Sequence, residues 1–320
     1  MYKRQAEIFS AVSFGTGGFR RSFVIKRLRP EMASNPVAVS QFIDEANLAS
    51  TLVHPNIVPV FDFGQIGGEY FLAQEYIVGR DLARLTRRML NRAEPALPVS
   101  AILFIAHEIL NGLEYAYGKR DDDGSPLGIV HRDVTPDNIM ISERGEVKLL
   151  DFGIMTSTQG QNPQTDVNVV KGSVDFMSPE QSRGRPVDQR ADLFSLGLVI
   201  YFCGARDTLY KGETLYDRLT KSATGPGPEE LARIASLPEP LPAILSKVLA
   251  VDPDERYETA AVFRAAITPY IVGGAVAVAE IIEKLYGDDL QLEQDRFAAA
   301  FPRPRTRENP TDIGKLSSKS

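Results

Sequence analysis

The chain has 320 residues, which is enough for one large domain or two modest lobes with ample core. Its formal net charge of −6 argues against nucleic-acid binding as the main task, and its single cysteine, Cys203, excludes an internal disulfide framework. The longest apolar run, at residues 271–282, contains Glu280 and is shorter than the about 20 residues that span a bilayer. We therefore expect a cytoplasmic chain without a membrane segment.

The first 78 residues are expected to form short strands and one helix. In "SNPVAVSQFIDEANLASTLV", Asn35 can cap a helix and Pro36 suits its first position. The helical period places five apolar residues on one face: Phe42, Ile43, Ala46, Ala49 and Val53. The strands are expected at residues 6–12, 21–28, 56–64 and 69–77, with a hairpin turn at Gly67 and Gly68.

From residue 79 to about residue 270 the pattern is mostly helical. Two short strands interrupt it, at residues 138–142 and 147–151. The segment "ADLFSLGLVIYFCG" is apolar almost all round, which predicts a buried central helix. One or two more helices are expected in residues 271–300, and residues 301–320 are poor in apolar side chains and are expected to be disordered.

Several short motifs stand in a fixed order along the chain. Lys26 ends "FVIK", and Glu45 follows on the expected helix. The motif "HRDVTPDN" precedes "DFG", which is followed by "GSVDFMSPE", "RADLFSLG" and "DPDERY". Each motif is a weak signal alone, but their ordered combination resembles the eukaryotic-like protein kinase family, and most of all bacterial serine/threonine kinases, over roughly residues 6–268.

The resemblance implies an α+β, bilobal fold. A small antiparallel β lobe with one helix would occupy residues 1–78, and a large helical lobe residues 79–270. Residues 271–300 would form a helical extension, and residues 301–320 a disordered tail or a linker toward a membrane anchor or another domain, so that the chain would be the cytoplasmic part of a longer kinase. The implied activity is transfer of the γ-phosphate of ATP, with Mg²⁺, to serine or threonine hydroxyls of protein substrates in bacterial signalling, with no nucleic acid as partner.

The resemblance also assigns roles to residues. Asp133 would accept the proton of the acceptor hydroxyl, and Asn138 and Asp151 would hold Mg²⁺. Lys26 would bind the α- and β-phosphates, with Glu45 as its ion-pair partner.

The resemblance also predicts the residues that bind the nucleoside. Backbone groups from Glu75 to Ile77 would bind the adenine edge, and Asp81 would contact the ribose. The side chains around the ring would be Ile8, Val24, Gln74 and Met140.

Supporting residues follow from the same resemblance. Glu180 is expected to pair with Arg256, and Asp192 to accept hydrogen bonds from the backbone at His131 and Arg132. His131 is interpreted as a packed structural residue. In the family, an arginine at the position of Arg132 often binds a phosphate in the activation segment and so switches the enzyme on. Here that segment would be residues 154–177, where the chain would phosphorylate itself. The candidate acceptors are Thr156, Ser157, Thr158 and Thr165, and Thr165 is preferred.

The glycine-rich stretch at residues 15–18 looks like the phosphate loop of this family but is interpreted as a turn. Gly18 lies eight residues before Lys26, which leaves no room for the strand and turn that separate loop from lysine in the family. The strand beginning at Ala6 then fits the family's second strand, and Gly15 to Gly18 join it to the next. The phosphate loop is expected upstream of Ala6, so the sequence resembles a kinase truncated at its start, and restoring that strand should raise ATP affinity.

Other functions remain open at this stage. Thr135 stands where many serine/threonine kinases carry lysine, which together with the short start favours a pseudokinase or scaffold. A small-molecule kinase of the aminoglycoside type would share the two carboxylates but generally lacks the "SPE" segment and the supports at Asp192 and Arg256. A tyrosine kinase is disfavoured because the catalytic loop reads "VTPDN".

Overall fold

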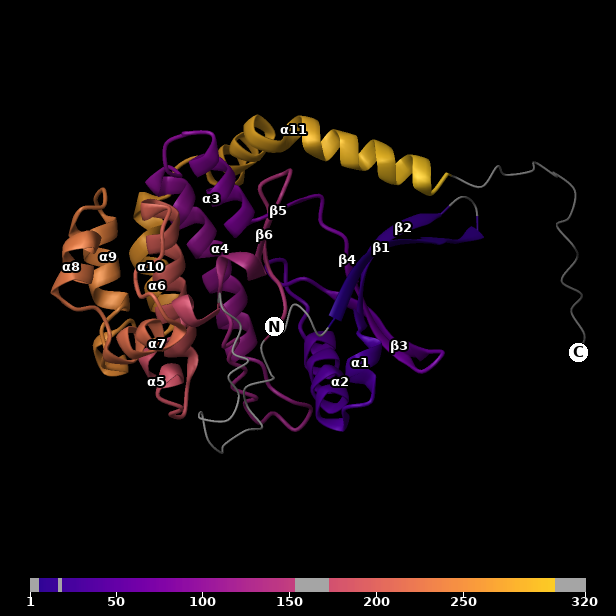
Figure 1. Ribbon diagram of the computed structural model, residues 1–320, viewed down its shortest axis with the longest axis horizontal. Helices are drawn as coiled ribbons and strands as arrows, with labels where there is room; N and C mark the ends of the chain where they lie inside the picture. The colour runs from indigo at the N-terminus through magenta and orange to yellow at the C-terminus, as the bar shows by residue number, and fades with distance from the viewer. Residues whose placement is uncertain (1–5, 17–18, 153–172, 303–320) are drawn as a thin grey trace, which may run out of the picture.

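The structure, a computed structural model, describes residues 6–16, 19–152 and 173–302 and has two lobes (Figure 1). The small lobe holds a four-stranded antiparallel sheet in the order β1-β2-β4-β3, accompanied by two helices. Its elements are β1 (Ala6–Phe14), β2 (Arg20–Leu28), α1 (Pro30–Ala33), α2 (Pro36–Thr51), β3 (Val60–Ile66) and β4 (Glu69–Glu75).

The strands of the small lobe pair as hairpins. Strands β1 and β2 are antiparallel from Ala6 opposite Leu28 to Phe14 opposite Arg20, and the Gly15 N–H donates to the Phe19 carbonyl at 2.9 Å. Gly17 and Gly18 of the predicted turn lie outside the described residues. Gly67 and Gly68 have φ angles of 59° and 88°, which glycine adopts without a steric cost, and they join β3 to β4.

Helix α2 begins as predicted but ends earlier. The Asn35 side chain accepts hydrogen bonds from the backbone N–H of Val37 and Ala38. Phe42 and Ala46 are buried, but Val53 lies beyond the end of the helix and is 75% exposed, so the prediction that it shares their helical face was wrong. The helix ends at Thr51 because Leu52 has extended backbone angles, and Leu52 takes the core position instead.

The large lobe is mainly helical, with a three-stranded sheet in the order β5-β6-β7 that faces the small lobe. Its first part contains β5 (Gly79–Asp81), α3 (Leu82–Asn91), α4 (Val99–Tyr117), β6 (Ile139–Ser142) and β7 (Val147–Leu149). Its later helices are α5 (Pro179–Ser182), α6 (Gln189–Ala205), α7 (Leu215–Thr224), α8 (Pro228–Ala235), α9 (Leu241–Val248), α10 (Ala260–Ile267) and α11 (Gly274–Ala300). Turns of 3-10 helix lie at Pro136–Asn138, Ser173–Phe176, Pro253–Glu255 and Thr268–Tyr270.

Helix α6 is the central helix that the apolar segment predicts. Its residues from Ala191 to Tyr201 are all buried, and they join one large cluster with α4, α9 and α10. Burial of this much apolar surface is the main favourable contribution to folding of the lobe. A helix buried on every side is fixed in position, which makes its ends suitable supports for a site.

The lobes are joined by backbone bonds and an apolar cluster. The expected strand at 56–64 starts only at Val60, because its first residues pair with the other lobe: Leu149 donates to the Asn56 carbonyl and Val58 to the Leu149 carbonyl. Five buried residues from both lobes fill the junction: Leu52, Ile57, Ala116, Ile129 and Phe152.

Within the described ranges, no single helix is long and apolar enough to cross a membrane. Residues 260–270 and α11 are long and apolar enough for a membrane span only when they are taken together, and they are bent by 75° relative to each other.

Candidate active site

An ammonium group joins carboxylates of both lobes. Lys26 on β2 lies 2.6 Å from the Glu45 carboxylate on α2 and 3.1 Å from that of Asp151, just after β7. Burial by itself lowers the pKa of Lys26, but Asp151 and Glu45 outweigh it and raise that pKa above its ordinary value. Burial raises the pKa of the Glu45 carboxyl, and the Lys26 ammonium opposes this. The lysine is therefore a fixed positive charge at the junction of the lobes.

The strand register places the nucleoside candidates of the small lobe on the same face as Lys26. Ile8 pairs with Lys26, and Gln74 pairs with Val24, which lies two residues before Lys26 on β2. Directly paired residues, and residues two apart on one strand, share a face of the sheet. Gln74 is buried, whereas Ile8 is 63% exposed on that face.

The catalytic loop brings Asp133 and Asn138 together. The Nδ2 amide of Asn138 donates to the Asp133 backbone carbonyl at 2.9 Å and to its carboxylate Oδ2 at 2.7 Å. The amide oxygen of Asn138 takes part in neither bond. The turn of 3-10 helix that begins at Pro136 folds the loop back so that these two residues meet.

Helix α6 fixes the catalytic loop through a side chain in its first turn. Asp192, in its first turn, accepts hydrogen bonds from the backbone N–H of His131 at 2.6 Å and of Arg132 at 2.7 Å, as predicted. Burial raises the pKa of Asp192, and the His131 and Arg132 contacts oppose this. Arg132 has a φ of 66°, a left-handed conformation that costs a non-glycine residue about 1 kcal/mol or more.

A further support of the loop was missed in the sequence. Gln181 closes a capping box with Ser178 at the start of α5, and its Nε2 also donates to the Arg132 carbonyl at 2.8 Å. The spacing of Ser178 and Gln181 predicts the cap. It gives no signal for the second bond, which reaches 49 residues back along the chain.

His131 is the packed residue that was expected. It is completely buried, its ring lies 4.5 Å from that of Phe152, and its Nε2 lies 2.9 Å from the Leu150 carbonyl. Asp151, between these two neighbours, has a φ of 38°, so both segments that carry the site hold a strained residue.

The connection between the lobes, residues 75–78, is called the hinge below. The Glu75 side chain is bound to Lys148 on β7 at 2.7 Å, a contact between the lobes that no sequence pattern indicated. Ile77 is partly buried in the same connection. Asp81 caps α3 through Arg84 and pairs with Met140 across β5 and β6, so both side chains lie at the large-lobe end of the hinge.

The predicted ion pair of the large lobe is also present. Arg256 donates to both oxygens of Glu180, at 2.7 and 2.8 Å, and both residues are buried. Burial raises the pKa of Glu180, but Arg256 outweighs it, so the pKa lies below its ordinary value. The bidentate pair fixes α5 against the later helices.

The residues at the junction of the lobes fit a nucleotide with a hard cation. Among the described residues, no group of three or more His, Cys, Asp or Glu side chains is arranged to hold a metal ion. Mg²⁺ on a nucleotide, however, takes only one or two protein oxygens besides phosphate and water. The Asp151 carboxylate and the Asn138 amide oxygen are ligands of that kind.

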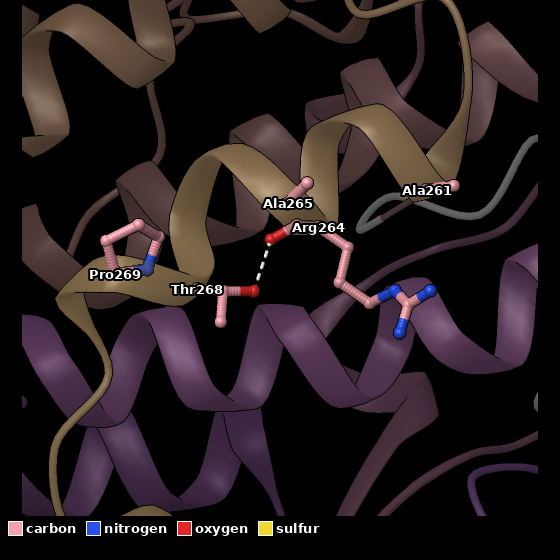
Figure 2. Close-up of a pocket in the computed structure, with 5 residues that line it drawn as sticks. All are labelled: Ala261, Arg264, Ala265, Thr268 and Pro269. Carbon is pink, nitrogen blue, oxygen red and sulfur yellow. Dashed lines mark hydrogen bonds between the residues drawn. The ribbon is translucent and has the colours of Figure 1, made fainter.

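Two other regions do not add to this site. The candidates Thr156, Ser157, Thr158 and Thr165 lie outside the described residues. Figure 2 shows a surface hollow of about 460 Å³ on α10 and the turn after it, lined by Ala261, Arg264, Ala265, Thr268 and Pro269. It contains none of the site residues above, and the Thr268 hydroxyl in it is bound to the Arg264 carbonyl.

Comparison with protein families gives one match that covers most of the chain. The family model described as "Protein kinase domain" matches residues 8–267. A solved structure of the Mycobacterium tuberculosis PknI kinase domain is 27% identical, with a TM-score of 0.58 over 83% of this chain and 91% of that one.

Curated relatives carry two kinds of name. "Tyrosine-protein kinase MasK" of Myxococcus xanthus is 36% identical over 300 residues, which is 91% of this chain and 46% of the relative. "Probable serine/threonine-protein kinase PknB" of Bifidobacterium longum is 31% identical over 319 residues, 95% of this chain and 43% of the relative. The chain thus spans less than half the length of these relatives.

Proposed function

Because this chain belongs to the protein kinase domain family, we propose that it transfers the γ-phosphate of ATP to serine or threonine hydroxyls of protein substrates. The observation that carries the proposal is a set of contacts that links four groups from distant parts of the sequence: Lys26, Asp133, Asn138 and Asp151. Lys26 lies 3.1 Å from Asp151 across the two lobes, and the Asn138 amide donates to the Asp133 carboxylate. The two pairs are connected because the backbone N–H of Leu150, next to Asp151, donates to the Asn138 carbonyl at 2.9 Å.

Each group has a task in the reaction. The Asp133 carboxylate accepts the proton of the acceptor hydroxyl, and the oxygen of that hydroxyl forms a bond to the γ-phosphorus. The bond from that phosphorus to the bridging oxygen breaks, and ADP leaves with the electron pair. Lys26, held by Glu45, binds the α- and β-phosphates, and the Asn138 bonds keep Asp133 oriented.

Asn138 and Asp151 are the residues that would hold Mg²⁺. Bound there, the ion would neutralise charge on the phosphate oxygens. For the nucleoside, the proposal assigns the ring to Ile8, Val24 and Met140, the pocket wall to Gln74, the adenine edge to the backbone from Glu75 to Ile77, and the ribose to Asp81. The shared face of the small-lobe sheet supports the assignment of Ile8, Val24 and Gln74.

The choice of acceptor is part of the proposal. The name of the PknB relative, and the catalytic-loop sequence "VTPDN", favour serine and threonine. The name of the MasK relative favours tyrosine as the second candidate. The proposal includes self-phosphorylation within residues 154–177 and a cytoplasmic reaction, which fits a chain with a single cysteine.

The test is phosphate transfer from ATP to a generic basic protein, with and without Mg²⁺. Asp133→Asn should lower kcat about 10²- to 10⁴-fold, because the carboxylate that takes the proton is gone. Thr135→Ala, two residues further along the same loop, is the matched control and should keep most of the activity. Phosphoamino-acid analysis separates serine and threonine from tyrosine, and full activity of Asp133→Asn would refute the assignment.

A further inference from the structure

Helix α11 lies outside the matched kinase domain, which ends at residue 267, yet it contacts the region where the nucleotide is proposed to bind. The helix has 27 residues and is therefore about 40 Å long. In Figure 1 it starts beside α3 in the large lobe and runs toward the β1–β2 hairpin of the small lobe.

The first half of α11 is anchored in the large lobe. Its buried apolar side chains join the main core: Val278, Ile282, Leu285, Tyr286 and Leu290. The Tyr286 hydroxyl donates to the Arg84 carbonyl at 2.9 Å, and Asp289 forms an ion pair with Arg88. This half of the helix is therefore part of the large lobe and moves with it.

The second half of α11 reaches the hinge. The Phe297 ring is stacked on the Tyr76 ring, with centroids 5.3 Å apart and planes at 11°. The Arg20 guanidinium of β2 lies 5.6 Å from the centroid of the same Phe297 ring. Phe297 thus touches both the connection between the lobes and the small-lobe hairpin.

A second contact lies one helical turn earlier. The Glu293 carboxylate accepts hydrogen bonds from Arg80 on β5, at 2.6 and 3.0 Å. The pair is bidentate, with the Arg80 side chain 11% exposed and the Glu293 side chain 50% exposed. The ion pair fixes this part of the helix to β5, whereas the aromatic contact of Phe297 fixes it to the hinge.

The position of Tyr76 gives this contact a consequence for binding. Tyr76 lies between Glu75 and Ile77, whose backbone groups are the proposed partners of adenine. The Glu75 side chain is held by Lys148, and the Val78 carbonyl accepts from the Glu143 N–H, so the ring of Tyr76 is a further point at which the hinge is fixed. A helix anchored in one lobe thereby sets the path of the chain between the two.

We propose that Phe297 is a positioning residue for nucleotide binding, which acts by holding Tyr76 so that the hinge backbone meets adenine in a fixed orientation. This rests on the proposed kinase function. The prediction is that loss of the ring weakens nucleotide binding about two- to tenfold, the range that corresponds to one aromatic pair, and raises KM for ATP with little change in kcat.

The experiment uses the full chain with Phe297→Ala, which keeps a good helix former at that position. Phe297→Tyr retains the ring and should behave as the original protein. Leu292→Ala is the matched control, since Leu292 is on the same helix and is 50% exposed. Two measurements are made: hydrogen exchange of residues 19–28 and 75–79 without nucleotide, and the Kd of the Mg²⁺ complex of a non-hydrolysable ATP analogue.

The proposal is supported if Phe297→Ala, and neither of the other two variants, speeds hydrogen exchange in both segments and raises the Kd of the analogue complex. An unchanged Kd in Phe297→Ala would overturn it, whatever the exchange shows, and so would an equal effect of Leu292→Ala. Neither measurement needs phosphate transfer. A chain that binds the analogue but transfers no phosphate would therefore refute the kinase proposal and leave this one to be judged separately.

Discussion

At Lys26 one ammonium serves two carboxylates that belong to different lobes. The contact to Glu45 lies within the small lobe, and the contact to Asp151 crosses to the large lobe. The Glu45 side chain is 6% exposed, so its charge depends on the lysine for compensation. The same atom thus contributes to folding and to phosphate binding, and the two contributions can be separated by mutation.

Lys26→Met should abolish phosphate transfer and lower the free energy of unfolding by about 3 kcal/mol, because it leaves a buried carboxylate without its partner. The double variant Lys26→Met/Glu45→Leu should recover most of that stability and remain inactive. Urea unfolding of the three proteins, with activity measured in parallel, tests this. A double variant as unstable as the single one would show that Glu45 is not the group left uncompensated.

At the scale of elements, the N-terminal turn of α6 acts on the catalytic loop through one side chain. The backbone N–H groups of His131 and Arg132 both end on Asp192, and the helix behind it is buried on all sides. The loop geometry therefore depends on a helix that does not itself touch the proposed nucleotide site.

Asp192→Asn should lower kcat about ten- to a hundredfold, since an amide replaces one charged acceptor by a donor and a hydrogen bond to a charged group contributes about 1.5–3 kcal/mol. KM for ATP should change little, because the hinge is untouched. Ser195→Ala is the control, as that buried hydroxyl donates to the Ala191 carbonyl of its own helix. Steady-state kinetics of both variants decide, and equal losses in the two would contradict the prediction.

The elements that the sequence predicted well are those with local signals. The Asn35 cap, the Gly67–Gly68 turn and the apolar segment of α6 each depend on residues close together in the chain. Strand β5 was not predicted, because its three residues become a strand only by pairing with β6, 60 residues away. Val53 was misplaced because periodicity does not show where a helix stops.

The site was predictable to the extent that motifs encode it. The pairings of Lys26 with Glu45 and of Glu180 with Arg256 were expected and are present. The bonds that orient the site were not foreseen, among them Gln181 to Arg132 and Glu75 to Lys148. Such contacts join distant segments and leave no periodic or spacing signal in the chain.

At the scale of the whole molecule, a ligand that contacts both lobes should stabilise the fold. If Mg²⁺ and ATP bind at the junction of the lobes, a hundredfold excess over Kd adds about 2.7 kcal/mol to the free energy of unfolding. For a chain of this size we expect Tm to rise by about 5 °C.

Thermal unfolding with ATP, with ATP and Mg²⁺, and after addition of EDTA measures this effect. EDTA should remove the part of the rise that depends on the metal. Asp151→Asn should lose the same part, because it removes the charged oxygen proposed to hold the ion. A shift in Asp151→Asn equal to that of the original protein would contradict the assignment of the metal ligand.

The left-handed backbone conformations of Arg132 and Asp151 have a consequence for attempts to make the protein more thermostable. Each conformation costs folding energy that neighbouring bonds must offset. A selection for heat tolerance alone would favour replacements that relieve those two positions. Thermostable variants obtained in that way would keep the fold and lose phosphate-transfer activity.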